Sequence, residues 1–126
     1  MQTPNELKYS KEHTWLLVDG NTGTVGITEF AQSELGEIVY IDLPNIGKSF
    51  KQEEVFGSVE AIKTVSDLFM PVSGEVIALN TELMEKPTLV NEEPFTGGWL
   101  LKIIISNPDE LNNLLSAEQY RQMAGD

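Results

Sequence analysis

The chain has 126 residues, of which 40% are hydrophobic, and its mean hydropathy is −0.16, so the composition predicts one folded, soluble domain over residues 1–126. It contains no cysteine and a single histidine, His13, which excludes disulfides, thiol catalysis, cysteine-ligated metals and a multi-histidine metal site. The net charge of −12 argues against nucleic acid and anionic membranes as partners, because both require a basic protein surface; it fits solubility or steering toward partners with basic rims.

The N-terminal residues show no targeting segment. Residues 1–13 (MQTPNELKYSKEH) are polar and of mixed charge, unlike a signal or transit peptide. The longest apolar cluster, WLLKIII at 99–105, is far too short to span a bilayer. We therefore expect a cytoplasmic protein.

A hairpin and a short helix are predicted next. Residues 13–19 and 24–28 have strand composition and flank the turn-rich GNTG at 20–23. Residues 29–35 then change to helical spacing, with Thr28 suited to cap the helix and Gly36 suited to end it. The residues expected to face the core from this helix are Phe30, Ala31 and Leu35.

Strands dominate the rest of the chain. EIVYIDL at 37–43 is apolar at nearly every position, which predicts a strand buried on both faces, and 43–47 reads as a turn. Further strand-like runs lie at 54–60, 64–70, 74–80 and 99–105. A long connection over 80–98 contains two prolines and a glycine pair, and loops of this length commonly carry function or cover a core edge.

The C-terminal segment is predicted to be helical. Asn107 is a suitable N-cap before Pro108, and Ser116 is placed to start a second helix through AEQYRQM. The sum is a mostly-β domain, a sandwich or flattened barrel, with short helices at its periphery and a C-terminal helical segment.

No motif of an enzyme active site is present: G-x-S-x-G, a Walker loop, G-x-G-x-x-G and H-E-x-x-H are all missing. Nothing marks a nucleophile for His13, which is expected to have a structural or surface role. Trp15 and Trp99 are expected to be core or rim aromatics. We predict no catalytic residue and no metal site, so any group-transfer chemistry must come from an attached group.

The informative segment is VFGSVEAIKTVSDLFMPVSGEV at 55–76. Two strand-like runs flank a short polar centre that contains Lys63. A lysine at a tight hairpin turn is held away from the body of the protein and stays accessible to a modifying enzyme. Pro71 and Gly74 then turn the chain back toward the core. Exposed turn lysines are common, so this geometry permits modification without identifying it.

The same segment closely resembles the lipoylation segment of glycine cleavage H-proteins. The family pattern has an acidic residue, two intervening residues, the modified lysine, a small residue, Ser-Asp and a Pro-Val-Ser-Gly-Glu turn; here these are Glu60, Lys63, Thr64, Ser66, Asp67 and 71–75. Further blocks in the family's order are LKYSKEHTWL, VGITEFAQSELGEIVYIDLP, LVNEEPFTGGWLLKI and SAEQY, so the resemblance covers nearly the whole chain.

This resemblance implies a lipoyl/biotinyl-type barrel-sandwich hybrid and a non-catalytic carrier. Lipoic acid would be amide-linked to Lys63, with Glu60 and Asp67 as candidates for recognition by the lipoylating enzyme, a lipoyl or octanoyl transferase or ligase. The arm would shuttle the aminomethyl group of glycine from glycine decarboxylase (P-protein) to the aminomethyltransferase (T-protein), and dihydrolipoamide dehydrogenase (L-protein) would reoxidise it.

Two positions depart from the family pattern. Thr14 stands where the family often has glutamate, and Phe30 where it often has histidine; in some members those side chains shelter the loaded arm. We therefore expect a looser, more apolar groove here.

Four alternative functions were weighed against the sequence. A lipoyl-relay H-protein paralogue stays open. A biotin carrier is disfavoured because Ile62 and Thr64, not methionines, flank Lys63, and a 2-oxoacid dehydrogenase lipoyl domain is disfavoured because no Ala/Pro-rich linker is present. An unmodified interaction domain is disfavoured by the intact Glu60 and Lys63.

Overall fold

The computed structural model describes residues 2–125. Its nine strands are β1 (Lys8–Tyr9), β2 (Thr14–Asp19), β3 (Thr22–Ile27), β4 (Ile38–Asp42), β5 (Ser49–Phe50), β6 (Val55–Ala61), β7 (Val65–Phe69), β8 (Gly74–Leu79) and β9 (Leu101–Ile105). The helices are α1 (Glu29–Leu35), α2 (Glu82–Glu85), α3 (Leu89–Glu92), α4 (Ala117–Ala124) and a 3₁₀ helix, η1 (Pro108–Asn113). No helix among residues 2–125 is long and apolar enough to cross a membrane.

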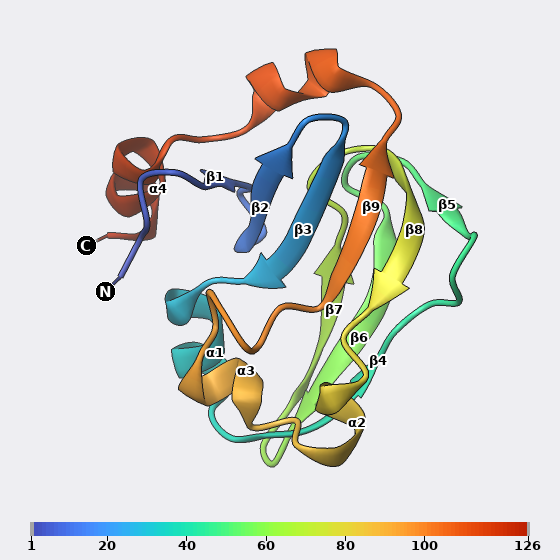
Figure 1. The fold of residues 1–126 in the computed structure, drawn as a ribbon. Helices are drawn as coiled ribbons and strands as arrows, with labels where there is room; N and C mark the ends of the chain where they lie inside the picture. The colour runs from blue at the N-terminus through green and yellow to red at the C-terminus, as the bar shows by residue number, and fades with distance from the viewer. Residues whose placement is uncertain (1, 126) are drawn as a thin grey trace.

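Two antiparallel sheets form the two layers of the molecule (Figure 1). One sheet has six strands in the order β1-β2-β3-β9-β8-β5, and the other has three in the order β4-β6-β7. Figure 1 shows the three-stranded sheet behind the larger one, with the helices at the ends and edges of the layers. The predicted mostly-β sandwich with short peripheral helices and a C-terminal helical segment is confirmed.

The main core lies between these sheets because each strand turns alternate side chains inward. In β9, Leu101, Ile103 and Ile105 are buried while Lys102 and Ile104 are exposed. The same core cluster includes Ile38, Ile41, Val59 and Leu68 from the three-stranded sheet. Burying these side chains at roughly 1.5–3 kcal/mol each is the main force that holds the layers together.

The prediction that residues 37–43 are buried on both faces is wrong. In β4, Ile38 and Ile41 are buried, but Val39 is 42% exposed and Tyr40 is 51% exposed. The strand is at the edge of the three-stranded sheet, and its register with β6 shifts between Ile38 and Tyr40. Only one face of this sheet is covered by the other layer, so an apolar composition alone did not reveal which side chains remain in solvent.

Helix α1 follows its local signals. The Thr28 hydroxyl accepts a hydrogen bond from the Ala31 amide at 3.2 Å, and the helix ends at Gly36, which has φ of 82°. Ala31 and Leu35 pack against the main core as expected. Phe30 does not belong to that core and instead packs against the His13 ring, with ring centroids 4.9 Å apart.

The long connection between β8 and β9 contains α2 and α3, which the sequence patterns did not predict. The buried Asn80 fixes its two ends, because its side-chain amide donates to the carbonyls of Gly97 at 2.9 Å and Trp99 at 2.8 Å. Asn91 joins it to α1, because its amide donates to the Gly36 carbonyl at 2.8 Å. These bonds make the connection part of the folded body.

A second, smaller core joins the two ends of the chain. Its buried members are Leu7, Tyr9, Trp15, Ala117 and Tyr120. Strand β1 pairs with β2. Helix α4 is capped by Ser116, which exchanges hydrogen bonds with Gln119, as the sequence predicted for the start of a second C-terminal helix. The first and last of the described residues therefore lie near α4 (Figure 1).

Candidate functional site

Lys63 lies at the turn of the β6–β7 hairpin, and its side chain is exposed. The Ala61 amide donates to the Thr64 carbonyl at 2.8 Å, which closes the turn around Ile62 and Lys63. The Ile62 amide donates to the Glu37 carbonyl at 3.1 Å, which attaches the turn to the segment that follows α1. These two hydrogen bonds hold the backbone of the turn in place, and the exposed Lys63 side chain projects from it.

Glu60 and Asp67 both lie on the outer face of the hairpin and are exposed. The register aligns Tyr40, Glu60 and Val65 in one row across the three strands. Cross-strand partners share a face of a sheet, and alternate residues along a strand do too. Glu60 and Asp67 therefore share this face with Tyr40 and Val65.

The opposite face of the hairpin borders a groove of about 280 Å³. Ser66, which pairs with the buried Val59, is the hairpin residue that lines it. The lining residues from elsewhere in the chain are Glu12, His13, Phe30, Ala31, Glu34 and Leu35. The groove therefore combines apolar walls with the carboxylates of Glu12 and Glu34. That it is looser and more apolar than in other members of the family stays a prediction.

His13 is fixed in this groove by contacts from distant segments. It is one of two non-glycine residues with positive φ among those described, at 69°. Its Nδ1 atom is 2.7 Å from the Tyr120 hydroxyl oxygen, which is itself 2.7 Å from the Thr28 hydroxyl. Burial lowers the pKa of His13, while Glu34 opposes that effect. The helical pattern predicted for AEQYRQM gave no indication of this contact.

The two departures from the family pattern have different surroundings. Thr14 is 1% exposed, and its hydroxyl oxygen is 2.6 Å from the Ser10 hydroxyl oxygen. It does not line the groove, whereas Phe30 does. Phe30 is therefore the departure that changes the groove wall directly.

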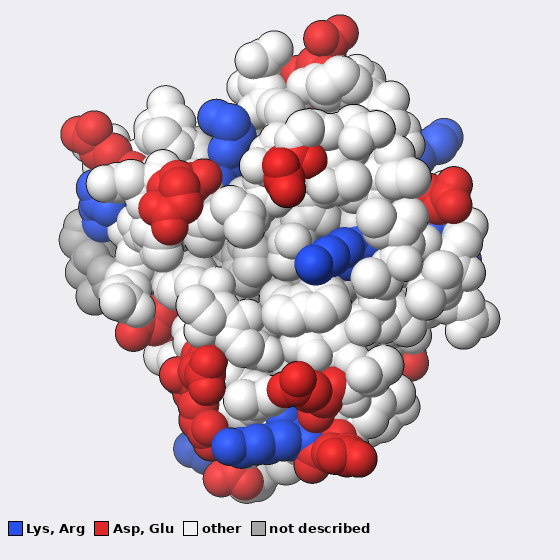
Figure 2. Space-filling view, in the orientation of Figure 1, with Lys and Arg blue, Asp and Glu red and all other residues white. Residues whose placement is uncertain are grey.

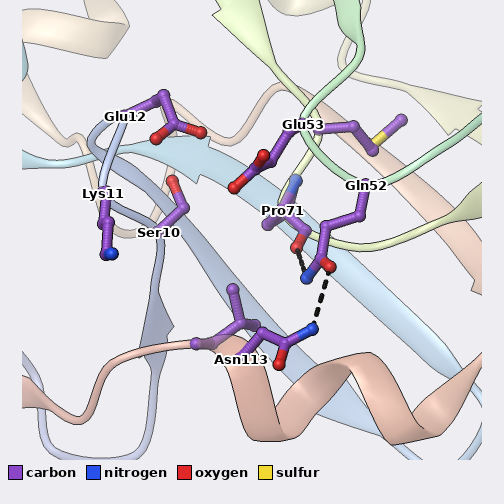
Figure 3. Close-up of a pocket in the computed structure, with 9 residues that line it drawn as sticks. Ser10, Lys11, Glu12, Gln52, Glu53, Pro71 and Asn113 are labelled. Carbon is purple, nitrogen blue, oxygen red and sulfur yellow. Dashed lines mark hydrogen bonds between the residues drawn. The ribbon is translucent and has the colours of Figure 1, made fainter.

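A second, more polar cavity of about 420 Å³ shares Glu12 with the groove. Figure 3 shows the carboxylates of Glu12 and Glu53 facing one another across it. Burial and the Glu53 carboxylate raise the pKa of Glu12. The Gln52 amide donates to the Pro71 carbonyl at 3.0 Å, and Asn113 donates to Gln52 at 3.1 Å, so these polar groups are occupied with one another (Figure 3).

No group of three or more histidine, aspartate or glutamate side chains among residues 2–125 is arranged to hold a metal ion. Trp15 is buried, and its indole donates to the carbonyls of Ile27 and Pro94, each at 3.0 Å. Trp99 is partly buried beside the second core. Both tryptophans thus have the core or rim positions that were predicted.

Acidic side chains gather at the end of the molecule where the hairpin turn, α2 and α3 lie (Figures 1 and 2). Figure 2 shows several Asp and Glu side chains and few basic ones at this lower end.

Comparison with known proteins gives consistent matches. The family model described as glycine cleavage H-protein matches residues 7–126. The chain is 51% identical over 126 residues to the glycine cleavage system H protein of Staphylococcus haemolyticus, covering 100% of both chains. It is 55% identical over 117 residues to that of Symbiobacterium thermophilum, covering 93% of this chain and 91% of the relative. A crystal structure of a glycine cleavage system H protein from Mycobacterium marinum matches with a TM-score of 0.90 and 32% identity, over 98% of this chain and 99% of that one.

Proposed function

The chain belongs to the glycine cleavage H-protein family, and from that premise we propose that Lys63 is the residue to which its lipoyl group is amide-linked. As a member of this family it is a non-catalytic lipoyl carrier within the glycine cleavage system. The observation that carries the assignment to Lys63 is the position of this exposed lysine at the turn of a braced hairpin, inside the segment that resembles the family's lipoylation pattern.

The geometry around Lys63 fits a long, flexible attached group. Its side chain is exposed at the turn, so an arm joined to its amine can extend into solvent or fold back along either face of the hairpin. When bound, the lipoyl group supplies a disulfide that can be reduced and can accept a one-carbon amine fragment, chemistry that no side chain of this cysteine-free protein provides.

The groove beside Ser66 is the resting place that we propose for the loaded end of the arm. Ser66 is three residues beyond Lys63, roughly 10 Å along an extended strand. The carboxylates of Glu12 and Glu34 would attract a primary ammonium group, while Phe30 and Leu35 exclude water from the fragment next to it.

The partners follow from the same assignment. We propose that glycine decarboxylase, the aminomethyltransferase and dihydrolipoamide dehydrogenase receive the arm in turn, and that a lipoyl or octanoyl transferase or ligase attaches it. The tether keeps the reactive end close to each docked partner and thereby raises its effective concentration. The acidic surface around the turn favours docking sites with basic rims, so higher salt should slow turnover with these partners.

Intact-mass spectrometry tests the attachment site. We expect protein from its native host to carry a lipoyl mass increment that maps to Lys63 and is absent in Lys63→Arg. Lys102→Arg is the matched control, because Lys102 is likewise exposed but lies on strand β9, away from the hairpin turn, and this variant should keep the full increment. An unmodified wild-type mass in cells with active lipoylation, or an increment retained by Lys63→Arg, contradicts the assignment.

A lipoyl-relay function is the second candidate, and the replacement of histidine by Phe30 in the groove wall favours testing it. A reconstituted assay with glycine decarboxylase separates the two functions. The shuttle function predicts that the lipoylated protein supports release of carbon dioxide from glycine, and the relay function predicts that it transfers its lipoyl group to another protein without supporting that release.

A further inference from the structure

A hydrogen-bond network connects the C-terminal helix to the wall of the groove beside Ser66. Helix α4 lies beside β1 (Figure 1), and the hydroxyl of its Tyr120 reaches both His13 and Thr28. We propose that Tyr120 is a positioning residue for the loaded arm, because this network holds His13 in the groove as an uncharged hydrogen-bond donor. The inference rests on the proposed resting place of the arm and adds the residue that shapes its wall.

The three side chains of the network lie in series. The hydroxyl oxygen of Thr28 is 2.7 Å from that of Tyr120, which in turn is 2.7 Å from Nδ1 of His13. Thr28 and Tyr120 are fully buried, and the Thr28 oxygen also accepts the Ala31 amide at 3.2 Å. The network therefore runs from the start of α1, through α4, to the groove.

Burial fixes the direction of each hydrogen bond. A hydroxyl group has one hydrogen to donate, and a buried one needs an acceptor inside the protein. Among the residues that the structure describes, the acceptor within reach of the Thr28 hydroxyl is the Tyr120 oxygen. Thr28 therefore donates to Tyr120, and the Tyr120 hydroxyl donates to Nδ1 of His13. Nδ1 then carries no hydrogen, so the neutral ring carries its hydrogen on Nε2.

Nε2 of His13 is the end of the network that is open to the groove. No described residue forms a hydrogen bond with this atom, whereas every buried side-chain nitrogen or oxygen of the described residues has a partner. Nε2 is therefore accessible to solvent, on a residue that lines the groove. The rings of Phe30 and Tyr120 pack on the imidazole, with centroids 4.9 and 5.7 Å from its own, and hold it in place.

The charge state of His13 sets how strongly the groove attracts an ammonium group. With a neutral ring, the carboxylates of Glu12 and Glu34 keep their full attraction for the ammonium of the loaded fragment. An imidazolium beside them would offset part of that attraction and repel the fragment. Burial lowers the pKa of His13, although Glu34 opposes this effect, so burial favours the same neutral form as the network.

Matched variants separate this role from a general contribution to stability. The test variant is Tyr120→Phe, which removes the hydroxyl and keeps the ring. The control is Tyr9→Phe, because Tyr9 is also fully buried in the second core and its hydroxyl donates to the Pro4 carbonyl at 2.7 Å. Each variant loses one buried hydroxyl. Circular dichroism and urea midpoints establish that both are folded.

The first measurement uses the unlipoylated protein. Long-range ¹H–¹⁵N spectra show which imidazole nitrogen carries the hydrogen. At pH 7.5, wild type and Tyr9→Phe should show His13 with its hydrogen on Nε2, whereas Tyr120→Phe should show a mixture of both tautomers. A wild-type ring with its hydrogen on Nδ1 overturns the proposal, as does an unchanged tautomer in Tyr120→Phe.

The second measurement is the lifetime of the loaded arm. Lipoylated protein is loaded by a purified glycine decarboxylase with glycine, separated from the enzyme and followed by intact mass. Loss of the fragment consumes one water: the carbon–sulfur bond breaks, sulfur keeps the electron pair and takes a proton, and formaldehyde and ammonium are released. We expect the half-life to fall about fivefold in Tyr120→Phe and to stay within about twofold of wild type in Tyr9→Phe.

The outcomes distinguish this inference from the proposals beneath it. Equal half-lives in wild type and a folded Tyr120→Phe overturn the role of Tyr120, as do equal losses in Tyr120→Phe and Tyr9→Phe. A wild-type half-life no longer than that of free aminomethylated dihydrolipoamide refutes the groove as the resting place, and this inference with it. Failure of wild type to become lipoylated at Lys63 refutes the attachment site itself.

Discussion

Removing the hydroxyl of Tyr120 should destabilise the protein measurably. Tyr120 is fully buried, and its hydroxyl oxygen lies 2.7 Å from His13 Nδ1 and 2.7 Å from the Thr28 hydroxyl oxygen. A typical buried hydrogen bond contributes about 1 kcal/mol net, so losing both in Tyr120→Phe should cost about 2 kcal/mol of unfolding free energy. For a domain of this size that corresponds to a fall in Tm of roughly 6–10 °C.

The size of the stability loss depends on whether Thr28 and His13 can form other hydrogen bonds once the Tyr120 hydroxyl is gone. Thr28 keeps its cap interaction with the Ala31 amide at 3.2 Å, so its loss is partial. His13 is half-buried, and water can reach part of its ring, which limits the penalty of leaving Nδ1 without a partner. The ring stack of Tyr120 on Tyr9, at 4.8 Å between centroids, is unchanged by the substitution.

The assay is urea unfolding at pH 7. Its matched control is Tyr40→Phe, which removes the same hydroxyl group from a tyrosine on the surface. Tyr40→Phe removes a hydroxyl from a tyrosine that is 51% exposed, and it should change stability by less than about 0.5 kcal/mol. The His13 ring resonances should shift in Tyr120→Phe and stay unchanged in Tyr40→Phe. Equal, small losses in both variants, or an unmoved His13 signal in Tyr120→Phe, would refute the reasoning.

Three further predictions concern the walls of the groove and the hairpin. Burial lowers the pKa of His13 below its usual value, so the stability from keeping it neutral is complete above about pH 6.5 and is lost as pH falls through the folded pKa. Urea midpoints at pH 7.5 and 5.5 should therefore differ more in wild type than in His13→Gln; the same difference in both would contradict this. Burial and the Glu53 carboxylate raise the pKa of Glu12, so the charged form of Glu12 destabilises the folded state. Glu12→Gln should therefore raise Tm at pH 7, and the gain should fade as the pH falls toward about 4. A gain that stays constant across that range would contradict this prediction. In Gly57→Ala the added methyl would lie 2.2 Å from the Asp42 carbonyl oxygen, so β4 must move; we expect a loss of about 2–3 kcal/mol in urea unfolding, and an unchanged midpoint would show that the strands tolerate the methyl.

The segments that were predicted well are those whose signals are local. Thr28 and Gly36 bound α1, and Ser116 starts α4, because a side-chain cap or a glycine with positive φ acts on atoms only a few residues away. The β6–β7 hairpin around Lys63 followed from two apolar runs with a polar centre. Such features require no knowledge of the rest of the molecule.

The features that were missed depend on which layer covers which surface. Tyr40 sits in an almost wholly apolar run, yet its side chain is exposed because β4 is an edge strand with only one covered face. Phe30 has helical spacing with Ala31, yet it packs on His13 instead of joining the main core. Periodicity reports which residues share a side of an element, and it does not report what lies opposite that side.

The sequence by itself determined the local elements, the exposed turn at Lys63, the absence of thiol chemistry and, through its resemblance, the family. Only the tertiary structure decided how distant residues meet. Tyr120 and His13 are 107 positions apart in the chain, and the groove brings Glu12, Glu34 and Ser66 together from three separate segments. The physical reason is that turn and cap energies act within a few residues, whereas contacts of this kind exist only after the two sheets and α4 have packed into one body.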